Sequence, residues 1–246
     1  GTTPPTLLID GQQTPYRYQL SPQQQNKILQ ADLVVWVGPE LETFMSAPLQ
    51  QLTSKTTVLT LLDNEEIKVL PSRWNENKRD PFFWLDSRNV IILADELARA
   101  LMRIDPDRRH LYERNRHQLL TRLAKLDRRL EYGYRGLKSG IGMAYYDTLQ
   151  YFEQAYALKI RGVVTQSPQT AVSGRSLLEN RAKLTSGNYS CLLTEQQFEV
   201  DQLSLLTQGV SLNITPLDSF GSTLEPGVDL YFSLMEHNTN AIKQCL

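Results

Sequence analysis

The chain has 246 residues, of which 41% are hydrophobic and 22% charged, a composition typical of a folded protein with one large or two smaller domains. Its 26 basic and 27 acidic side chains give a formal net charge of −1, so the overall balance provides no electrostatic reason to expect binding to nucleic acid or to an anionic membrane. No apolar run approaches the roughly 20 residues that span a bilayer, and the opening GTTPPTLLID does not have the pattern of a signal peptide.

The first part of the chain predicts alternating strands and helices. The run at 33–37 is apolar, mostly β-branched or aromatic, and ends at a Gly-Pro pair, which is typical of a buried strand. A short helix is predicted over 39–49 and a second strand over 56–62. Because both strands are apolar throughout, we expect a parallel sheet covered by helices on both faces. The polar stretch 63–79 predicts a loop.

Two long helices are predicted next. Ser87 is a good N-cap, and apolar residues recur at three- and four-residue steps as far as Ile104. Asp105 followed by Pro106 is a typical helix start. The helix that follows has wide polar faces rich in Arg and Glu, so we expect it to be only partly buried.

The remainder of the chain repeats the first pattern. Strands are predicted over 140–145, 161–165, 190–193 and 210–215, and helices over 149–158, 174–184, 198–208 and 228–243. Strand and helix therefore alternate on both sides of the long helix. We predict an α/β protein made of two lobes with parallel sheets.

The sequence contains none of the common enzyme signatures. It has no nucleophile elbow, P-loop or dinucleotide fingerprint, and we expect neither catalysis nor a cofactor. The three histidines, His110, His117 and His237, fall in predicted helices, where we expect surface positions rather than a zinc site. Tyr145-Tyr146-Asp147 ends a predicted strand, where open α/β sheets bind ligands, although ordinary packing is the alternative.

The two cysteines leave two alternatives open. Cys191 and the penultimate Cys245 either form a disulfide that ties down the terminal helix in an oxidising compartment, or are two unrelated buried thiols.

Several segments, taken in order, resemble one family. They are ADLVVWVGPELETFM, DPFFWL before a long helix, YYDTLQYFEQAYAL, and CLLTEQQF followed by LDSFG. From about residue 15 to the end the chain resembles the zinc/manganese periplasmic binding proteins of ABC transporters, and most closely the zinc-specific branch of Gram-negative bacteria. The resemblance implies two α/β lobes joined by one rigid helix, with the ligand cleft between the lobes.

The resemblance also implies a division of the chain and a cellular context. We expect an N-terminal lobe over 1–105, a linking helix over 106–131 and a C-terminal lobe over 132–246. A Cys191–Cys245 disulfide, a periplasmic location, an inner-membrane ABC permease as partner and a monomeric state are implied. The family's first strand and helix would precede Tyr16, but only 15 residues do so here, and whether that segment is absent from the natural protein stays open.

The family's metal ligands are largely replaced. The resemblance assigns ligand positions to Tyr16, Phe82, Tyr146 and Asp218, where the family has three histidines and a carboxylate. The region near 63–79, where the zinc branch has a His-rich loop, contains no histidine. Phenylalanine has no lone pair for a metal, and phenol ionises only near pH ~10. We therefore predict a degenerate site that holds no bare zinc ion.

Three possibilities for this cleft remain open. The first is a collapsed aromatic plug. The second is a site for a metal chelate or small organic ligand, which suits aromatic walls with one carboxylate. A ferric-like ion on Tyr16, Tyr146 and Asp218 is the third, because these are hard oxygen ligands. Two functions compete accordingly. The protein either delivers a ligand to an ABC permease or is a non-transporting accessory or interaction protein of the periplasm.

Overall fold

The structure, a computed structural model, describes residues 4–9, 14–136, 141–186, 189, 191–198 and 202–245. The chain divides into two compact units, 1–129 and 130–246, and the division falls inside helix α4 (Arg109–Tyr134). Each unit contains its own parallel sheet, so the predicted α/β class with parallel sheets and a long helix is confirmed. The predicted three-part division of the chain stays a prediction.

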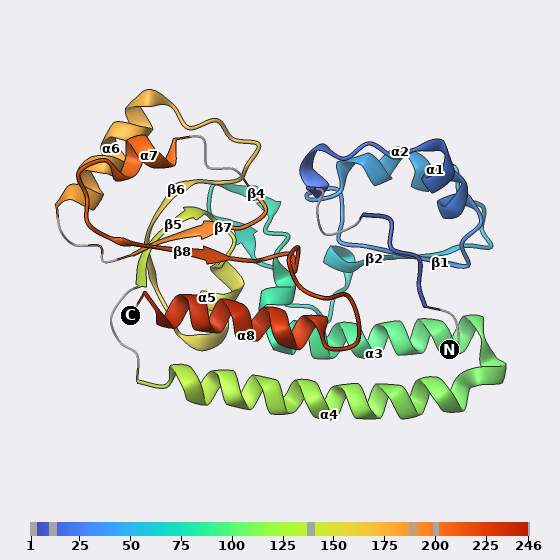
Figure 1. Cartoon of the computed structure of the whole chain (residues 1–246). Coiled ribbons are helices and arrows are strands. Elements are labelled where there is room, and N and C mark those ends of the chain that lie inside the picture. The colour runs from blue at the N-terminus through green and yellow to red at the C-terminus, as the bar shows by residue number, and fades with distance from the viewer. Residues whose placement is uncertain are drawn as a thin grey trace. The chain divides into compact units, whose positions relative to one another are not determined.

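The first unit is built around a short parallel sheet. Strands β1 (Leu33–Trp36) and β2 (Thr57–Thr60) pair in register, and α1 (Pro22–Leu29) and α2 (Ser46–Leu49) lie on the opposite face of the sheet from α3 (Ser87–Ile104) (Figure 1). A core cluster of Ile28, Val34, Trp36 and Met45 joins the two short helices to β1. Short 3-10 turns connect these elements at Pro15–Arg17, Thr43–Met45, Leu61–Asp63, Phe83–Leu85 and Pro106–Arg108.

Three local predictions for this unit were wrong. The predicted helix over 39–49 is reduced to a 3-10 turn and the four-residue α2. The predicted loop contains a hairpin of β3 (Pro71–Ser72) and β4 (Asn75–Arg79). The hairpin ends where the Arg79 guanidinium binds the carboxylates of Glu40 and Asp63. Apolar patterning did not predict the hairpin, because its strands are polar and the ion pairs of Arg79 join residues far apart in the sequence.

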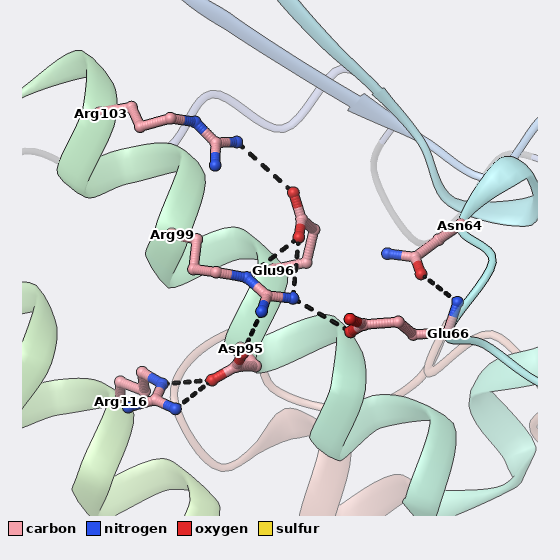
Figure 2. A network of polar contacts seen from close by, with 7 residues as sticks. All are labelled: Asn64, Glu66, Asp95, Glu96, Arg99, Arg103 and Arg116. Atoms are coloured by element: carbon pink, nitrogen blue, oxygen red, sulfur yellow. Dashed lines mark hydrogen bonds and ion pairs between the residues drawn. The ribbon is translucent and has the colours of Figure 1, made fainter.

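The third error concerns the start of α3. Asp86, rather than Ser87, is the N-cap, and its carboxylate accepts a hydrogen bond from the backbone N of Arg88 at 3.0 Å. The Ser87 hydroxyl instead donates to Oδ1 of Asp127 in α4 at 2.7 Å. A second set of polar contacts also links α3 to α4, since Arg116 of α4 pairs with Asp95 of α3 (Figure 2). These contacts hold the first part of α4 against the first unit.

The second unit has a four-stranded parallel sheet of order β6-β5-β7-β8. The strands are β5 (Ile141–Tyr146), β6 (Ile160–Thr165), β7 (Cys191–Glu195) and β8 (Asn213–Leu217). The helices are α5 (Gln150–Tyr156), α6 (Gly174–Thr185), α7 (Leu203–Thr207) and α8 (Leu230–Lys243). Helices α6 and α7 lie on one face of the sheet and α5 and α8 on the other (Figure 1).

The predicted alternation of this half is confirmed with shifted boundaries. Strand β8 begins three residues later than the predicted 210, and α7 covers only part of the predicted helix 198–208. Gly140, Ser190 and residues 199–201, which were also predicted to be structured, lie outside the described residues. Gly142 has a packing role, because a Cβ there would lie 2.0 Å from the carbonyl oxygen of Cys191.

A disulfide joins β7 to the end of α8. Cys191 and Cys245 are bonded, with their Cα atoms 5.2 Å apart, and both are buried. The disulfide implied by the family resemblance is therefore confirmed. Among the described residues, no helix has both the length and the apolar character needed to cross a bilayer.

Candidate functional site

Asp218 lies directly after β8 and is almost completely buried, with 1% of its surface exposed. Its Oδ1 accepts hydrogen bonds from the backbone N and hydroxyl of Ser222, at 2.9 and 3.2 Å, and from the backbone N of Phe220 at 3.3 Å. Its Oδ2 accepts from the backbone N of Thr223 at 3.0 Å. The Thr223 hydroxyl lies 3.0 Å from Oδ2 and 2.9 Å from the side-chain oxygen of Gln196, and its one proton serves either acceptor.

These donors fill the carboxylate. Each oxygen of an ionised carboxylate offers about two lone-pair directions. Three donors converge on Oδ1, and Oδ2 accepts from the backbone N of Thr223 and from the shared Thr223 hydroxyl. Burial raises the pKa of Asp218, but the hydrogen bonds from Thr223 and Ser222 outweigh it and hold the pKa below the ordinary value of 3.8. Asp218 is thus an ionised residue that organises the loop 219–223.

A second buried carboxylate, Glu195, lies at the end of β7. Its Oε1 accepts from the hydroxyls of Thr148 and Ser219, at 2.7 and 2.6 Å, and its Oε2 accepts from the backbone N of Ser219 at 3.0 Å. Burial raises the pKa of Glu195, the charge of Asp218 acts in the same direction, and the Ser219 and Thr148 hydrogen bonds oppose both. Glu195 therefore fastens the start of the Asp218 loop to the residues that follow β5.

A row of aromatic rings begins at the end of β5 and reaches the loop that follows Asp218. Tyr146, the last residue of β5, packs its ring 4.8 Å from that of Tyr145 and 5.5 Å from that of Phe198, measured between centroids. The ring of Phe198 lies 5.7 Å from that of Phe220. Since Phe220 also donates its backbone N to Asp218, the row brings Tyr146 and Asp218 to the same edge of the sheet. This is the edge where open parallel sheets bind ligands.

The other two predicted site residues belong to the first unit. Tyr16 lies in the 3-10 turn that follows Thr14, whose hydroxyl accepts the backbone N of Tyr16 at 3.3 Å. Phe82 is buried, with 4% exposed, and its backbone N donates to Oδ1 of Asp80 at 2.9 Å. Its ring lies 5.5 Å from that of Trp84. Each residue is described within its own unit, so a common site for all four stays a prediction.

The histidines lie elsewhere. His110 and His117 are exposed on α4, as predicted. His237 on α8 is different, because its Nε2 is buried without a hydrogen-bond partner, and the prediction of a surface position was wrong for this nitrogen. Across the described residues, no group of three or more His, Cys, Asp or Glu side chains is arranged to hold a metal ion.

The chemistry that this edge offers combines a row of aromatic rings with the two buried carboxylates Asp218 and Glu195. Sequence reasoning named Tyr146 and Asp218, whose place in a binding site stays a prediction, and did not name Glu195, Phe198 and Phe220, which lie at the same edge. The signal was present in two segments that carried the family resemblance, TEQQF at 194–198 and LDSFG at 217–221, of which only Asp218 was given a role in the site. Each segment begins at the end of a strand, and the two strands are neighbours in one parallel sheet, so both segments lie at its carboxyl edge.

Comparison with known proteins identifies relatives along the whole chain. A family model described as zinc-uptake complex component A, periplasmic, matches residues 1–245. The high-affinity zinc uptake system protein ZnuA of Brucella abortus is 26% identical over 287 positions, which cover 100% of this chain and 86% of that protein. The protein of the same name from Haemophilus influenzae is 22% identical over 295 positions, covering 100% and 87%.

Solved structures share the fold. The periplasmic zinc binding protein TroA from Treponema pallidum superposes with a TM-score of 0.82 at 19% identity, covering 94% of this chain and 86% of that one. Fe(III)-bound YtgA from Chlamydia trachomatis gives a TM-score of 0.80 at 21% identity, covering 96% and 88%. At these identities the likeness establishes the two-lobe α/β fold and nothing about the ligand.

Proposed function

The chain belongs to the family of periplasmic zinc-uptake complex A components, and from that premise we propose that it is a solute-binding protein with a degenerate metal site. This family consists of solute-binding proteins rather than enzymes. The proposal has two parts. The protein retains the binding role of its family in the periplasm, and its ligand is not a bare zinc ion.

The proposal that the ligand is not a bare zinc ion rests on the hydrogen bonds that Asp218 already accepts. Among the four family ligand positions, Asp218 alone still has a side chain of the usual zinc-ligand types. Its two oxygens are already occupied by donors from Phe220, Ser222 and Thr223. A metal would have to compete with these part-buried donors for the carboxylate oxygens.

The surroundings support a larger ligand with delocalised or apolar surface. In the second unit, the rings of Tyr146, Phe198 and Phe220 form a continuous wall beside the ionised Asp218. In the first unit, the Phe82 position adjoins Trp84. Aromatic walls near a carboxylate suit a metal chelate or a small organic cation, which cation–π and dispersion contacts recognise without direct metal coordination.

Two alternatives remain as distinct outcomes. A ferric ion on Tyr16, Tyr146 and Asp218 fits hard oxygen donors, and one protein of this fold is described as Fe(III)-bound. The filled Asp218 carboxylate argues against that set here. The other alternative is an accessory or interaction protein that no longer delivers a ligand to the expected partner, an inner-membrane ABC permease.

Isothermal titration calorimetry with ZnCl₂ tests the first claim. We expect no one-to-one zinc isotherm in the submicromolar range. Such an isotherm, abolished by Asp218→Ala in a variant whose melting curve shows it folded, would contradict the proposal. A parallel titration with Fe(III) citrate, followed by tyrosinate charge-transfer absorbance, tests the ferric alternative.

Native mass spectrometry of protein purified without chelator tests the ligand class. A retained adduct whose mass exceeds that of a single metal ion is the result expected of a chelate- or organic-binding protein. Tyr146→Ala, which removes the centre of the aromatic row, should abolish this adduct, while replacing the exposed Tyr132 by Ala should not. A bare protein mass under gentle conditions would favour the accessory role.

A further inference from the structure

Glu195 joins three segments at the carboxyl edge of the second sheet. It is the last residue of β7, with 4% of its surface exposed, and β7 lies between β5 and β8. Thr148 belongs to the segment that follows β5, and Ser219 to the segment that follows β8. The Glu195 carboxylate accepts from the hydroxyls of both residues and from the backbone N of Ser219. One side chain of the middle strand thus holds the segments on either side of it.

Two rings of the aromatic row lie one short turn of backbone away from these anchored residues. Tyr146 is two residues before Thr148, whose backbone N donates to the carbonyl oxygen of Tyr146 at 3.2 Å. The backbone N of Phe198 donates to the carbonyl oxygen of Glu195 at 3.3 Å. Turns closed by bonds over two or three residues leave the chain little freedom. The position of each ring therefore follows that of the residue that Glu195 anchors.

The third ring belongs to Phe220, which directly follows the residue that Glu195 holds twice. Ser219 is fully buried and donates both its backbone N–H, at 3.0 Å, and its hydroxyl, at 2.6 Å, to Glu195. The rings meet edge to face, with interplanar angles of 81° between Tyr146 and Phe198 and 82° between Phe198 and Phe220. Contacts of this kind depend on ring orientation, so a shift of one segment alters the whole row.

We propose that Glu195 is a positioning residue that holds Tyr146, Phe198 and Phe220 in the arrangement that receives the ligand. It acts through the segments it joins and does not touch the ligand, because its carboxylate is buried and occupied by three donors. This role rests on the proposed function, in which the row forms a wall of the ligand site.

Hydrogen bonding, rather than charge, is what the role requires. The three donors to Glu195 are uncharged, and the hydroxyls of Thr148 and Ser219 can accept as well as donate. A glutamine in place of Glu195 could therefore accept from the backbone N of Ser219 and donate to the two hydroxyls, which keeps three bonds. Methionine has a side chain of similar length but only a weak acceptor and no donor. The two replacements separate hydrogen bonding from side-chain size.

Fluorine NMR of protein labelled with 4-fluorophenylalanine tests the role without any ligand. The chain has seven phenylalanines, and the variants Phe198→Leu and Phe220→Leu assign the two signals of the row. Glu195→Met should shift or broaden both signals by more than any change at Phe44 and Phe83, which belong to the first unit. Glu195→Gln should leave both signals close to their wild-type positions. Circular dichroism melting checks that the variants fold.

Two single-arm variants decide the matter even if Glu195→Met does not fold. Thr148→Val keeps the shape of the side chain and removes the bond toward β5, so it should shift the Phe198 signal, whose ring contacts Tyr146, more than that of Phe220. Ser219→Ala should show the reverse order, because it releases the residue next to Phe220.

Thr239→Val is the matched control, since it removes another buried threonine hydroxyl of the same unit and should move neither signal. Unchanged Phe198 and Phe220 signals in the Thr148 and Ser219 variants, or equal shifts in Glu195→Gln and Glu195→Met, would overturn the proposal. So would shifts in the Thr239 variant as large as those in Thr148→Val. Because no ligand is present, such a failure would leave the zinc titration and the mass measurement of the proposed function unaffected.

Discussion

Asp218 and Asn238 are joined by a reciprocal pair of hydrogen bonds. The backbone N of Asp218 donates to Oδ1 of Asn238 at 2.9 Å, and Nδ2 of Asn238 donates to the carbonyl oxygen of Asp218 at 3.0 Å. Asn238 is fully buried within α8. The side-chain amide of Asn238 thus forms the two hydrogen bonds with Asp218 that a neighbouring strand could form, and it fixes the end of β8 to α8.

Replacing Asn238 should therefore loosen the candidate site and the fold together. Asn238→Ala leaves one N–H and one carbonyl of Asp218 buried and unpaired, and we expect a loss of about 2–4 kcal/mol in the free energy of unfolding. Urea denaturation measures this loss. Asn240→Ala, on an exposed position of the same helix, is the control and should change stability by less than about 0.5 kcal/mol. Equal effects from both variants would show that the pairing contributes nothing.

Asp218 itself should give the protein a specific acid sensitivity. Its folded-state pKa lies below the ordinary value of 3.8, so its contribution to stability is fully present above pH 3.8. That contribution is lost as the pH falls through the folded-state pKa. Asp218→Asn should lower the free energy of unfolding by about 1.5–3 kcal/mol at pH 7, because an amide NH₂ would face the donors of Thr223.

The difference between wild type and Asp218→Asn should then shrink below pH 3.8, as wild-type Asp218 becomes protonated. Urea midpoints measured from pH 7 down to pH 3 would follow this convergence. Glu225→Gln removes an exposed carboxylate from the same unit and should show no such dependence. A constant difference across the whole range would mean that the carboxylate charge of Asp218 is not what the loop requires.

The disulfide should be a main source of stability for the second unit. Cys191 and Cys245 are separated by 54 residues, and closing a loop of that length stabilises the folded state by about 4 kcal/mol in the chain-entropy model. We expect the double variant Cys191→Ala, Cys245→Ala to melt at a lower temperature than the oxidised wild type and to ignore reductant. Thiol titration of denatured, non-reduced wild type should find no free thiol; two free thiols would contradict the bond.

The sequence predicted those features that local pattern decides. The apolar run beginning at Leu33 and the helix ending at Ile104 have periodicities that need no tertiary information. The hairpin at 71–79 was missed because its strands are polar and its anchor, the pairing of Arg79 with Glu40, spans 39 residues. Glu195 was missed as a site residue for the same reason, since Thr148 is 47 residues away.

The role of Asp218 was only partly visible in the sequence. Its place in the site was inferred from LDSFG, but the run Asp-Ser-Phe-Gly-Ser-Thr at 218–223 is also typical of an aspartate that accepts hydrogen bonds from the loop following it. The resemblance directed attention to metal coordination, and the local pattern indicated loop capping. The hydrogen bonds of the folded chain favour the second interpretation.

Restoring histidine at the three replaced positions tests the degenerate site most directly. The triple variant Tyr16→His, Phe82→His, Tyr146→His supplies three imidazoles, and three protein ligands with one water make a competent zinc site. If the four family positions belong to one site, zinc affinity measured by calorimetry should rise by about two orders of magnitude or more over the wild type. The single variant Phe82→His is the control, because one histidine cannot complete the ligand set.

The same triple variant distinguishes the two roles of Asp218. If its carboxylate remains committed to Ser222 and Thr223, adding Asp218→Asn should lower stability and leave the regained zinc affinity within about tenfold, since water can be the fourth ligand. If Asp218→Asn abolishes zinc binding in a variant that still melts cooperatively, the loop opens to release the carboxylate to the metal. In that case the replacement of the histidines alone, rather than the capture of Asp218 by its loop, would account for the degenerate site that we propose.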